Sequence, residues 1–178
     1  MSERKSCFIF PATEMAIKAR IDTLKEEVAN LGQSGVFGMD DGDSMDDSEM
    51  LSARVGMARL YGEIASMNRL LGVSHVWTVE DVRRNNFDFI TLGSEVDAIV
   101  NYPDGKKEKL KFSVGSPLDA DVRFNPQDPG EHSIISIETP FAQAILGATK
   151  GDSRNYKSRD GVVVVDIKNV SKSPFLTS

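Results

Sequence analysis

The stretch DDGDSMDDSE, residues 40–49, places six carboxylates within ten residues. It lies between two segments in which apolar residues recur at spacings of three and four. A connection between two pairing helices sits at the far end of the rod that the helices form. An acidic run by itself is usually a solvated loop. The flanking helical patterns instead predict a hairpin whose tip delivers negative charge, or a metal ion held by that charge.

Two helices are predicted from the heptad patterns on either side of the acidic stretch. Thr13 is the predicted N-cap of the first helix, Asp43 or Ser44 caps the second, and Gly72 ends the second. The two apolar seams, which we expect to form an ordinary coiled-coil core, consist of Ile17, Ile21, Leu24, Val28 and Leu31, and of Ala53, Met57, Leu60, Ile64, Met67 and Leu71.

The segment between the first seam and the acidic stretch is rich in glycine. Gly32, Gly35 and Gly38 each weaken a helix by about 1 kcal/mol relative to alanine. Two alternatives follow: the helix continues through the glycines with tertiary support, or an irregular arm packs through Val36 and Phe37. We expect the last part of this segment, about residues 35–42, to form a mobile loop.

The second half of the chain changes to an apolar period of two, which predicts strands. A compact helix is predicted over residues 140–147, with Thr139 as its cap and Gly147 as its end. Residues 81–88 are predicted to be a linker or turn, and residues 171–178 a frayed tail. The predicted strands are 92–100, 110–114, 134–137 and 161–170, the last of which carries valine on both faces and is expected to be central or well covered.

These patterns predict an α+β protein with two domains. The first is an N-terminal antiparallel α-helical coiled-coil hairpin with an acidic tip, residues 1–76. The second is a small β-sheet domain with one short helix, residues 84–172.

Composition narrows the functional classes. The formal net charge of −6 argues against non-specific nucleic-acid binding by charge alone. Cys7 is the only cysteine, which excludes an intrachain disulfide and fits a reducing cytosol. No apolar run approaches the ~20 residues of a membrane helix, and the N-terminus lacks the apolar region of a secretory signal. We therefore expect a cytoplasmic protein that does not contact a membrane.

Several metal and hydrolase sites can be excluded. Counted from Asp41, the glycine position of an EF-hand falls on Asp46 and its twelfth position on Ser52. His75 and His132 are far apart and have no cysteine or histidine nearby, which argues against a zinc site. A stand-alone two-carboxylate hydrolase needs a pocket, and a hairpin tip offers none.

Taken together, these residues resemble the Gre-type bacterial transcript cleavage factors, which bind RNA polymerase. The resemblance covers nearly the whole chain. Residues 42–49 (GDSMDDSE) are similar to the family's tip signature, in which Gly-Asp is followed three positions later by an acid and then by a Glu. No single one of the similar segments is specific to the family, but the order in which they follow a predicted coiled coil is specific. The similar pieces of the second half are LGSEV (92–96), VG with AD (114–115, 120–121), ISIETPFAQAILG (135–147) and GD (151–152).

The resemblance implies a coiled-coil hairpin joined to an FKBP-like domain. That domain would dock at the mouth of the polymerase secondary channel, and the hairpin would enter the channel. By position, Asp43 and Asp46 would help to hold a second Mg²⁺ at the polymerase active site, where the backtracked 3′ end of the nascent RNA is cleaved. The protein would then be an accessory factor and not an enzyme.

The resemblance also implies roles for neighbouring residues. Asp41, Asp47 and Glu49 would support the tip. Thr139, Pro140 and Phe141 would contact the polymerase, although a helix cap alone also explains this turn. We expect the isolated chain to be a monomer that binds no cofactor by itself.

Two alternatives stay open at this point. The additional acids Asp40, Asp41 and Asp47 make the tip similar to that of the Gre-homologue inhibitors, which share the fold, carry aspartate-rich tips and block polymerase. The other alternative is an unrelated coiled-coil adaptor with an acidic loop. An assay of RNA cleavage on backtracked complexes separates the three functions.

Overall fold

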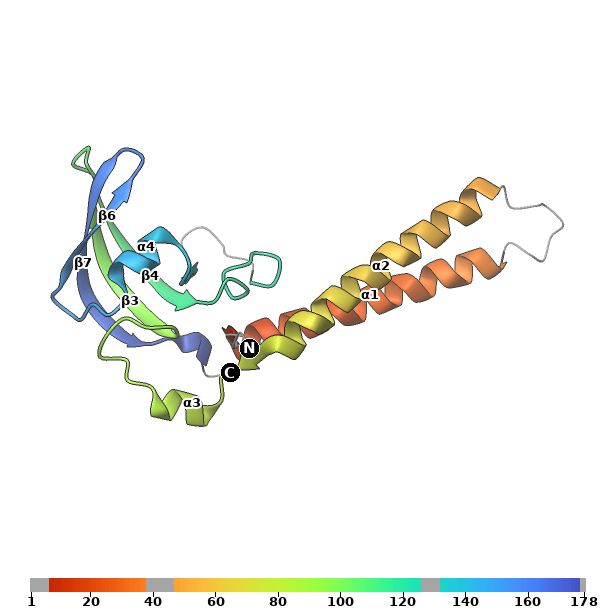
Figure 1. Ribbon diagram of the computed structural model, residues 1–178, viewed down its shortest axis with the longest axis horizontal. Coiled ribbons are helices and arrows are strands. Elements are labelled where there is room, and N and C mark those ends of the chain that lie inside the picture. The colour runs from red at the N-terminus through yellow and green to blue at the C-terminus, as the bar shows by residue number, and fades with distance from the viewer. Residues whose placement is uncertain (1–6, 38–46, 126–131, 177–178) are drawn as a thin grey trace, which may run out of the picture. The chain divides into compact units, whose positions relative to one another are not determined.

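The computed structural model describes residues 7–37, 47–125 and 132–176 (Figure 1). Within these ranges, the side chains of residues 34–37 and 47–50 are not described. The chain divides into two compact units. One is helical and comprises Met15–Ser74, and the other combines Met1–Glu14 with His75–Ser178.

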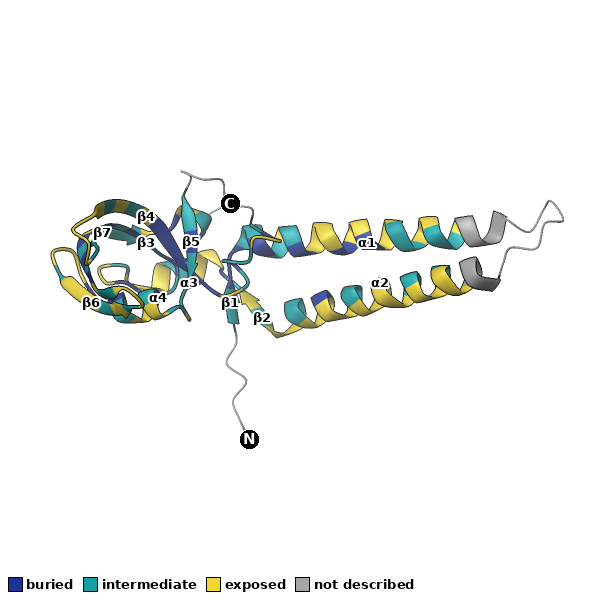
Figure 2. Ribbon diagram, turned by 90° about the horizontal axis from the view of Figure 1, so that it is seen from above, coloured by how far each residue is buried: buried dark blue, intermediate teal, exposed yellow. Residues whose placement is uncertain are grey.

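Two long helices make up the helical unit. Helix α1 spans Pro11–Phe37 and helix α2 spans Asp47–Val73, with 27 residues in each. They lie side by side and run in opposite directions (Figures 1 and 2). The predicted seams lie at the contact, since their most buried members are Ile17, Ile21, Leu24, Leu60 and Met67.

Helix α1 continues through its glycines, so the first of the two alternatives holds as far as Phe37. The prediction of a loop from Gly35 onward is wrong for residues 35–37, and residues 38–42 lie outside the described residues. Tertiary support explains the helix: Leu31 approaches Gly56 of α2 so closely that a Cβ there would meet Leu31 Cδ1 at 3.7 Å. Contact with the partner helix offsets the low intrinsic helix propensity of glycine.

Helix α2 also runs past its predicted end. Gly72 was the expected stop, but the helix includes it and ends at Val73. The Ser74 hydroxyl donates a hydrogen bond to the Leu70 carbonyl at 2.7 Å, which satisfies one of the free carbonyls of the last turn.

The other unit contains two sheets. A small sheet pairs β1 (Cys7–Ile9) with β2 (Ser74–Val76). The larger one has the strand order β5-β4-β3-β7-β6, and only the β4–β5 pair is parallel. In Figure 1 this sheet curls around helix α4. The remaining bounds are α3 (Val79–Arg84), β3 (Ser94–Asn101), β4 (Lys107–Gly115), β5 (Ser133–Ser136), α4 (Pro140–Ile145), β6 (Ser153–Ser158), β7 (Gly161–Lys172) and a 3₁₀ turn, η1 (Pro174–Leu176).

The core lies between the concave face of the sheet and α4. Phe141 of α4 packs its ring against Phe112 at 5.5 Å and against Tyr156 at 5.7 Å between ring centroids. Alternate residues of β3 point into this core, as the period of two predicted. The α+β class, the four predicted strands and the helix after Thr139 are thus confirmed, and β7 is an internal strand of the sheet.

Two predictions for this unit fail, and one strand was missed. Residues 79–84, assigned mostly to a linker, form α3, which Thr78 and Asp81 stabilise by a capping box. The predicted tail is ordered as far as Leu176, since β7 extends to Lys172 and Leu176 of η1 is buried, and residues 177–178 lie outside the described residues. Strand β6 has the polar sequence SRNYKS and was not predicted, because an edge strand needs few apolar residues.

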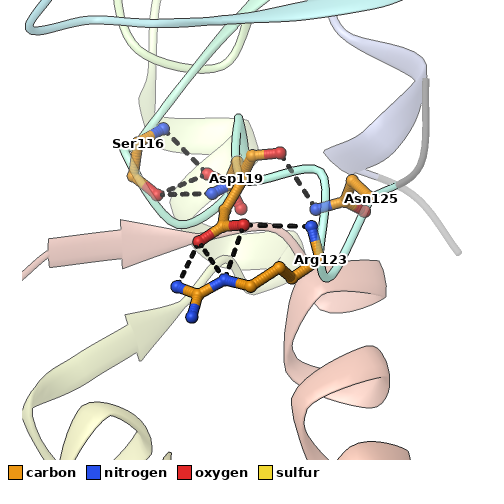
Figure 3. A network of polar contacts seen from close by, with 5 residues as sticks. Ser116, Asp119, Arg123 and Asn125 are labelled. Carbon is orange, nitrogen blue, oxygen red and sulfur yellow. Dashed lines mark hydrogen bonds and ion pairs between the residues drawn. The ribbon is translucent and has the colours of Figure 1, made fainter.

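A buried carboxylate, that of Asp119, holds the start of α1. Figure 3 shows the contacts of Asp119 with Ser116 and Asn125. Asp119 Oδ1 accepts hydrogen bonds from Phe10 N at 2.8 Å and Thr13 Oγ1 at 2.6 Å. Its Oδ2 accepts from the backbone and hydroxyl of Ser116 at 2.9 and 2.8 Å. Burial raises the pKa of Asp119, and the four donors oppose that rise. The predicted N-cap was wrong: Thr13 lies inside the helix, and Asp119 satisfies donors of the first turn from a distant part of the chain.

We predict that Asp119→Ala destabilises the unit that contains Asp119 by at least about 2 kcal/mol, because each buried donor left without an acceptor costs about 1–3 kcal/mol. Urea unfolding followed by the fluorescence of Trp77, the only tryptophan, measures this change. Asp121→Ala is the matched control. It removes an exposed ion pair with Arg123, a type of contact worth about 0–1 kcal/mol. Equal stability of the two variants would contradict the role assigned to Asp119.

Candidate functional site

The predicted site at the tip lies largely outside the described residues. Asp41, Asp43 and Asp46 fall in the undescribed segment 38–46. Asp47 and Glu49 belong to the first turn of α2, but their side chains are not described. The structure does establish what the acidic stretch connects. It joins the adjacent ends of two antiparallel helices, each roughly 40 Å long at ~1.5 Å per residue.

The residues that the structure describes lack two further features. Within them, no group of three or more His, Cys, Asp or Glu side chains is arranged to hold a metal ion. In the same residues, no helix is both long and apolar enough to cross a bilayer.

The predicted partner-binding turn lies at the start of α4. Thr139 Oγ1 accepts a hydrogen bond from Ala142 N at 3.2 Å and donates one to the Ser136 carbonyl at 2.9 Å. Its predicted role as the cap of α4 is therefore confirmed. Phe141 points into the core, whereas Pro140, the first residue of the helix, is exposed. Of the three predicted contact residues, Pro140 is the one that a partner reaches most easily.

Sequence reasoning missed a Ser–His–Glu cluster at one end of the sheet. Ser113 Oγ lies 2.9 Å from His132 Nε2, and His132 Nδ1 lies 3.2 Å from Glu95 Oε1. These distances match the connectivity of a hydrolytic triad. However, Ser113 is fully buried, and its Oγ also lies 2.7 Å from Ser173 Oγ. A substrate carbonyl cannot reach this hydroxyl, so the cluster links strands and is not a nucleophilic site.

The surroundings of His132 favour its neutral form. Burial lowers the pKa of the imidazole below its usual value of 6.5, and the positive charge of Lys111 acts in the same direction. The carboxylates of Glu95 and Asp97 act in the opposite direction without reversing the shift. The ring also packs edge-on against Phe175 with centroids 5.5 Å apart. No sequence motif signals this cluster, because its members are spread over β3, β4, the start of β5 and the C-terminal segment.

Comparison with known proteins adds a family match to this geometry. A family model described as the C-terminal part of the transcription elongation factors GreA/GreB matches residues 84–172. GreA of Bacillus licheniformis is 28% identical over 171 residues, which cover 92% of this chain and 97% of that protein. GreA of Shouchella clausii is 30% identical over 129 residues, which cover 72% of this chain and 73% of that protein.

Two solved structures are also similar. The GreA factor homolog 1 (Gfh1) of Thermus thermophilus shares 21% identity at a TM-score of 0.38, over 94% of this chain and 99% of that one. A GreA/GreB elongation factor from Nitrosomonas europaea shares 18% identity at a TM-score of 0.35, over 93% and 98% of the two chains.

We predict that stability falls on acidification below pH 6.5, because the unfolded chain takes up a proton that folded His132 binds less readily. This contribution is fully present above pH 6.5 and is lost as the pH falls toward the lowered pKa of the folded state. Urea midpoints measured between pH 5 and 8 test it. His132→Gln should reduce this slope, whereas His75→Gln, which changes the other histidine, should leave it in place. A slope unchanged by His132→Gln would refute the assignment.

Proposed function

Because this chain belongs to the GreA/GreB family of transcription elongation factors, we propose that it binds a bacterial-type RNA polymerase and stimulates cleavage of backtracked nascent RNA. The structural observation that carries the proposal is the pair of antiparallel 27-residue helices. The stretch of the sequence that joins their adjacent ends carries six carboxylates. A rod of this kind reaches a site inside a channel that a globular domain cannot enter.

Each of the two predicted regions has its own role in this proposal. The helical hairpin, predicted at residues 1–76 and built from α1 and α2, enters the secondary channel. The FKBP-like domain predicted at residues 84–172 docks at the channel mouth. The exposed Pro140 at the start of α4 contacts the polymerase. Thr139, which caps α4, and Phe141, which packs against the core, hold the turn in place. The tip then reaches the polymerase active site and the 3′ end of the RNA.

The chemistry of the tip suits Mg²⁺. Asp43 and Asp46 offer hard carboxylate oxygens three residues apart, and Mg²⁺ prefers such oxygens in an octahedral shell that retains several waters. Two carboxylates cannot complete that shell, so the ion is held jointly with the polymerase and not by the isolated chain. When bound, the ion lowers the pKa of an attacking water and stabilises the charge that develops at the phosphate. Asp41, Asp47 and Glu49 strengthen the negative field around the pair.

The surplus aspartates favour one competing function. Asp40, Asp41 and Asp47 bring the tip to six acids, and excess negative charge near the catalytic metals would also suit a factor that blocks polymerase. In both functions the chain is an accessory factor, and the nuclease activity belongs to the polymerase. The adaptor alternative predicts no effect on the polymerase at all.

We predict that the wild-type chain accelerates release of short 3′ RNA fragments from backtracked complexes. Asp43→Asn and Asp46→Asn should each lower that rate by more than ~10-fold, because loss of even an outer-shell partner of a metal costs about 10–100-fold in activity. Both variants should still bind the polymerase. Asp160→Asn, which changes an exposed turn of the other unit, is the control. Suppression of both cleavage and elongation by the wild-type chain would favour the inhibitor function, and absence of polymerase binding would favour the adaptor.

We predict that Pro140→Ala weakens polymerase binding while costing less than about 1 kcal/mol of stability, since proline at such a compatible position contributes about 0.4–1 kcal/mol. Co-purification with polymerase and urea unfolding measure the two effects. Pro103→Ala, in the exposed turn between β3 and β4, is the matched control. Unchanged binding by Pro140→Ala would remove this turn from the docking surface and leave the proposal for the tip intact.

A further inference from the structure

A shallow groove lies on the convex face of the larger sheet, on the side opposite the core. Its volume is about 410 Å³. Asp97 is the cross-strand partner of Lys111, and Ile99 is the partner of Lys109. Because paired residues share a face, these four side chains stand together on the side away from Val96, Ala98 and Val100. The groove is lined by Asp97, Ala98, Ile99, Lys109, Leu110, Lys111 and Lys168.

A third lysine stands on this face, beside a β-bulge in β7. Asp97 pairs with Asn169 of β7, but the next residue, Ala98, pairs with Ile167, so Lys168 has no partner on β3. Ile167 is buried in the core, and Lys168 is exposed. Regular alternation after the buried Ile167 places Lys168 on the outer face, and the bulge places Asn169, the partner of Asp97, on the same face. Lys168 therefore joins Lys109 and Lys111 on the outer face of the sheet.

The groove carries an excess of positive charge. Lys109 and Lys168 form no ion pair within 4.0 Å of any residue that the structure describes. Lys168 does interact electrostatically with Asp166, whose pKa it helps to lower, and Lys111 Nζ lies 3.2 Å from Glu95 Oε1. Asp97 is the only carboxylate in the lining. Three lysines around one aspartate indicate a negatively charged occupant, in a chain whose own net charge is −6.

The outer positions distinguish between two kinds of negative occupant. Single-stranded nucleic acid is bound by a positive groove together with aromatic rings on which bases stack. None of the outer positions on β3, β4 and β7 within the described register is aromatic. Instead, the partly buried side chain of Ile99 lies between the lysines. The outer positions are Glu95, Asp97, Ile99 and Asn101 on β3, Lys107, Lys109, Lys111 and Ser113 on β4, and Val164, Asp166, Asn169 and Ser171 on β7.

We propose that this groove, the Lys109–Lys168 groove, binds an acidic segment of a partner protein. An aliphatic side chain of that segment packs on Ile99, and flanking carboxylates pair with Lys109 and Lys168. The interaction involves neither the tip nor Pro140, so it does not rest on the function proposed above. Lysine heads act as mobile point charges, which suits an extended acidic peptide better than one rigid bidentate ligand.

A fluorescein-labelled peptide of sequence EDLDE, titrated with the full chain at low salt, tests the proposal. Anisotropy should rise on binding and the affinity should weaken with added salt. Lys109→Glu and Lys168→Glu should each lower the affinity at least about fivefold, the equivalent of one exposed ion pair. Lys150→Glu makes the same change in net charge at an exposed site outside the groove lining and should leave the affinity within about twofold of wild type. A peptide with serine in place of leucine should bind more weakly, because it cannot pack on Ile99.

Several results would overturn the proposal. These are absence of peptide binding, equal weakening by Lys150→Glu, and equal affinity for the serine peptide. Oligouridine that binds more tightly than the peptide, and loses affinity with Lys109→Glu, would show a nucleic-acid surface instead. The Trp77 fluorescence of each variant confirms that a lost signal does not come from unfolding, since the lysines are exposed and their replacement should leave the fold intact.

Discussion

The apolar contact between α1 and α2 is the constraint on which the position of the acidic stretch depends. A single helix of this composition would be marginal in water, and a carboxylate-rich connection would find no fixed place at its end. Ile17, Ile21 and Leu24 of α1 and Leu60 and Met67 of α2 are buried, and the burial of these apolar seams holds the two helices together. The same contact carries α1 through glycines that would otherwise favour a loop. The packing of the helices thus fixes where the two ends that the acidic stretch joins lie relative to each other.

A second constraint is the buried carboxylate of Asp119. It joins the first turn of α1 to the segment that follows β4, through donors more than 100 positions away in sequence. Desolvation works against the charged form, and the hydrogen bonds from Phe10, Thr13 and Ser116 compensate for it. Gly115 leaves room for this arrangement, since a Cβ at that position would lie 2.7 Å from Asp119 Cβ and 2.6 Å from Ile134. The close approach explains why a glycine precedes Ser116.

Periodicity in the sequence predicted the elements that bury one face. The two helices and strands β3, β4, β5 and β7 carry apolar residues at regular spacing, and each was predicted near its observed place. Elements that are stabilised by backbone pairing, capping or contacts distant in sequence were missed. The edge strand β6 depends on backbone pairing with β7, and α3 depends on its capping box. The N-cap of α1 and the Ser113–His132–Glu95 cluster arise from contacts distant in sequence, for which no local pattern exists. The predicted tip residues Asp41, Asp43 and Asp46 lie outside the described residues, so their roles stay predictions.

The distribution of charge connects the tip with the groove. The six carboxylates of residues 40–49 account for the whole formal net charge of −6, because the remaining acids are equal in number to the 21 lysines and arginines. The rest of the chain is therefore balanced, and its charge acts locally through contacts such as Lys111 with Glu95. Against that balanced background the stretch at the tip is a concentrated negative source, whose field extends about a Debye length of ~8–10 Å at physiological salt. On an open surface the electrostatic interactions of this stretch are screened over that short distance. They are stronger inside a narrow, low-dielectric site, where screening is weaker. The physical chemistry thus agrees with a tip that works inside a partner and with lysines at the groove that act at contact distance.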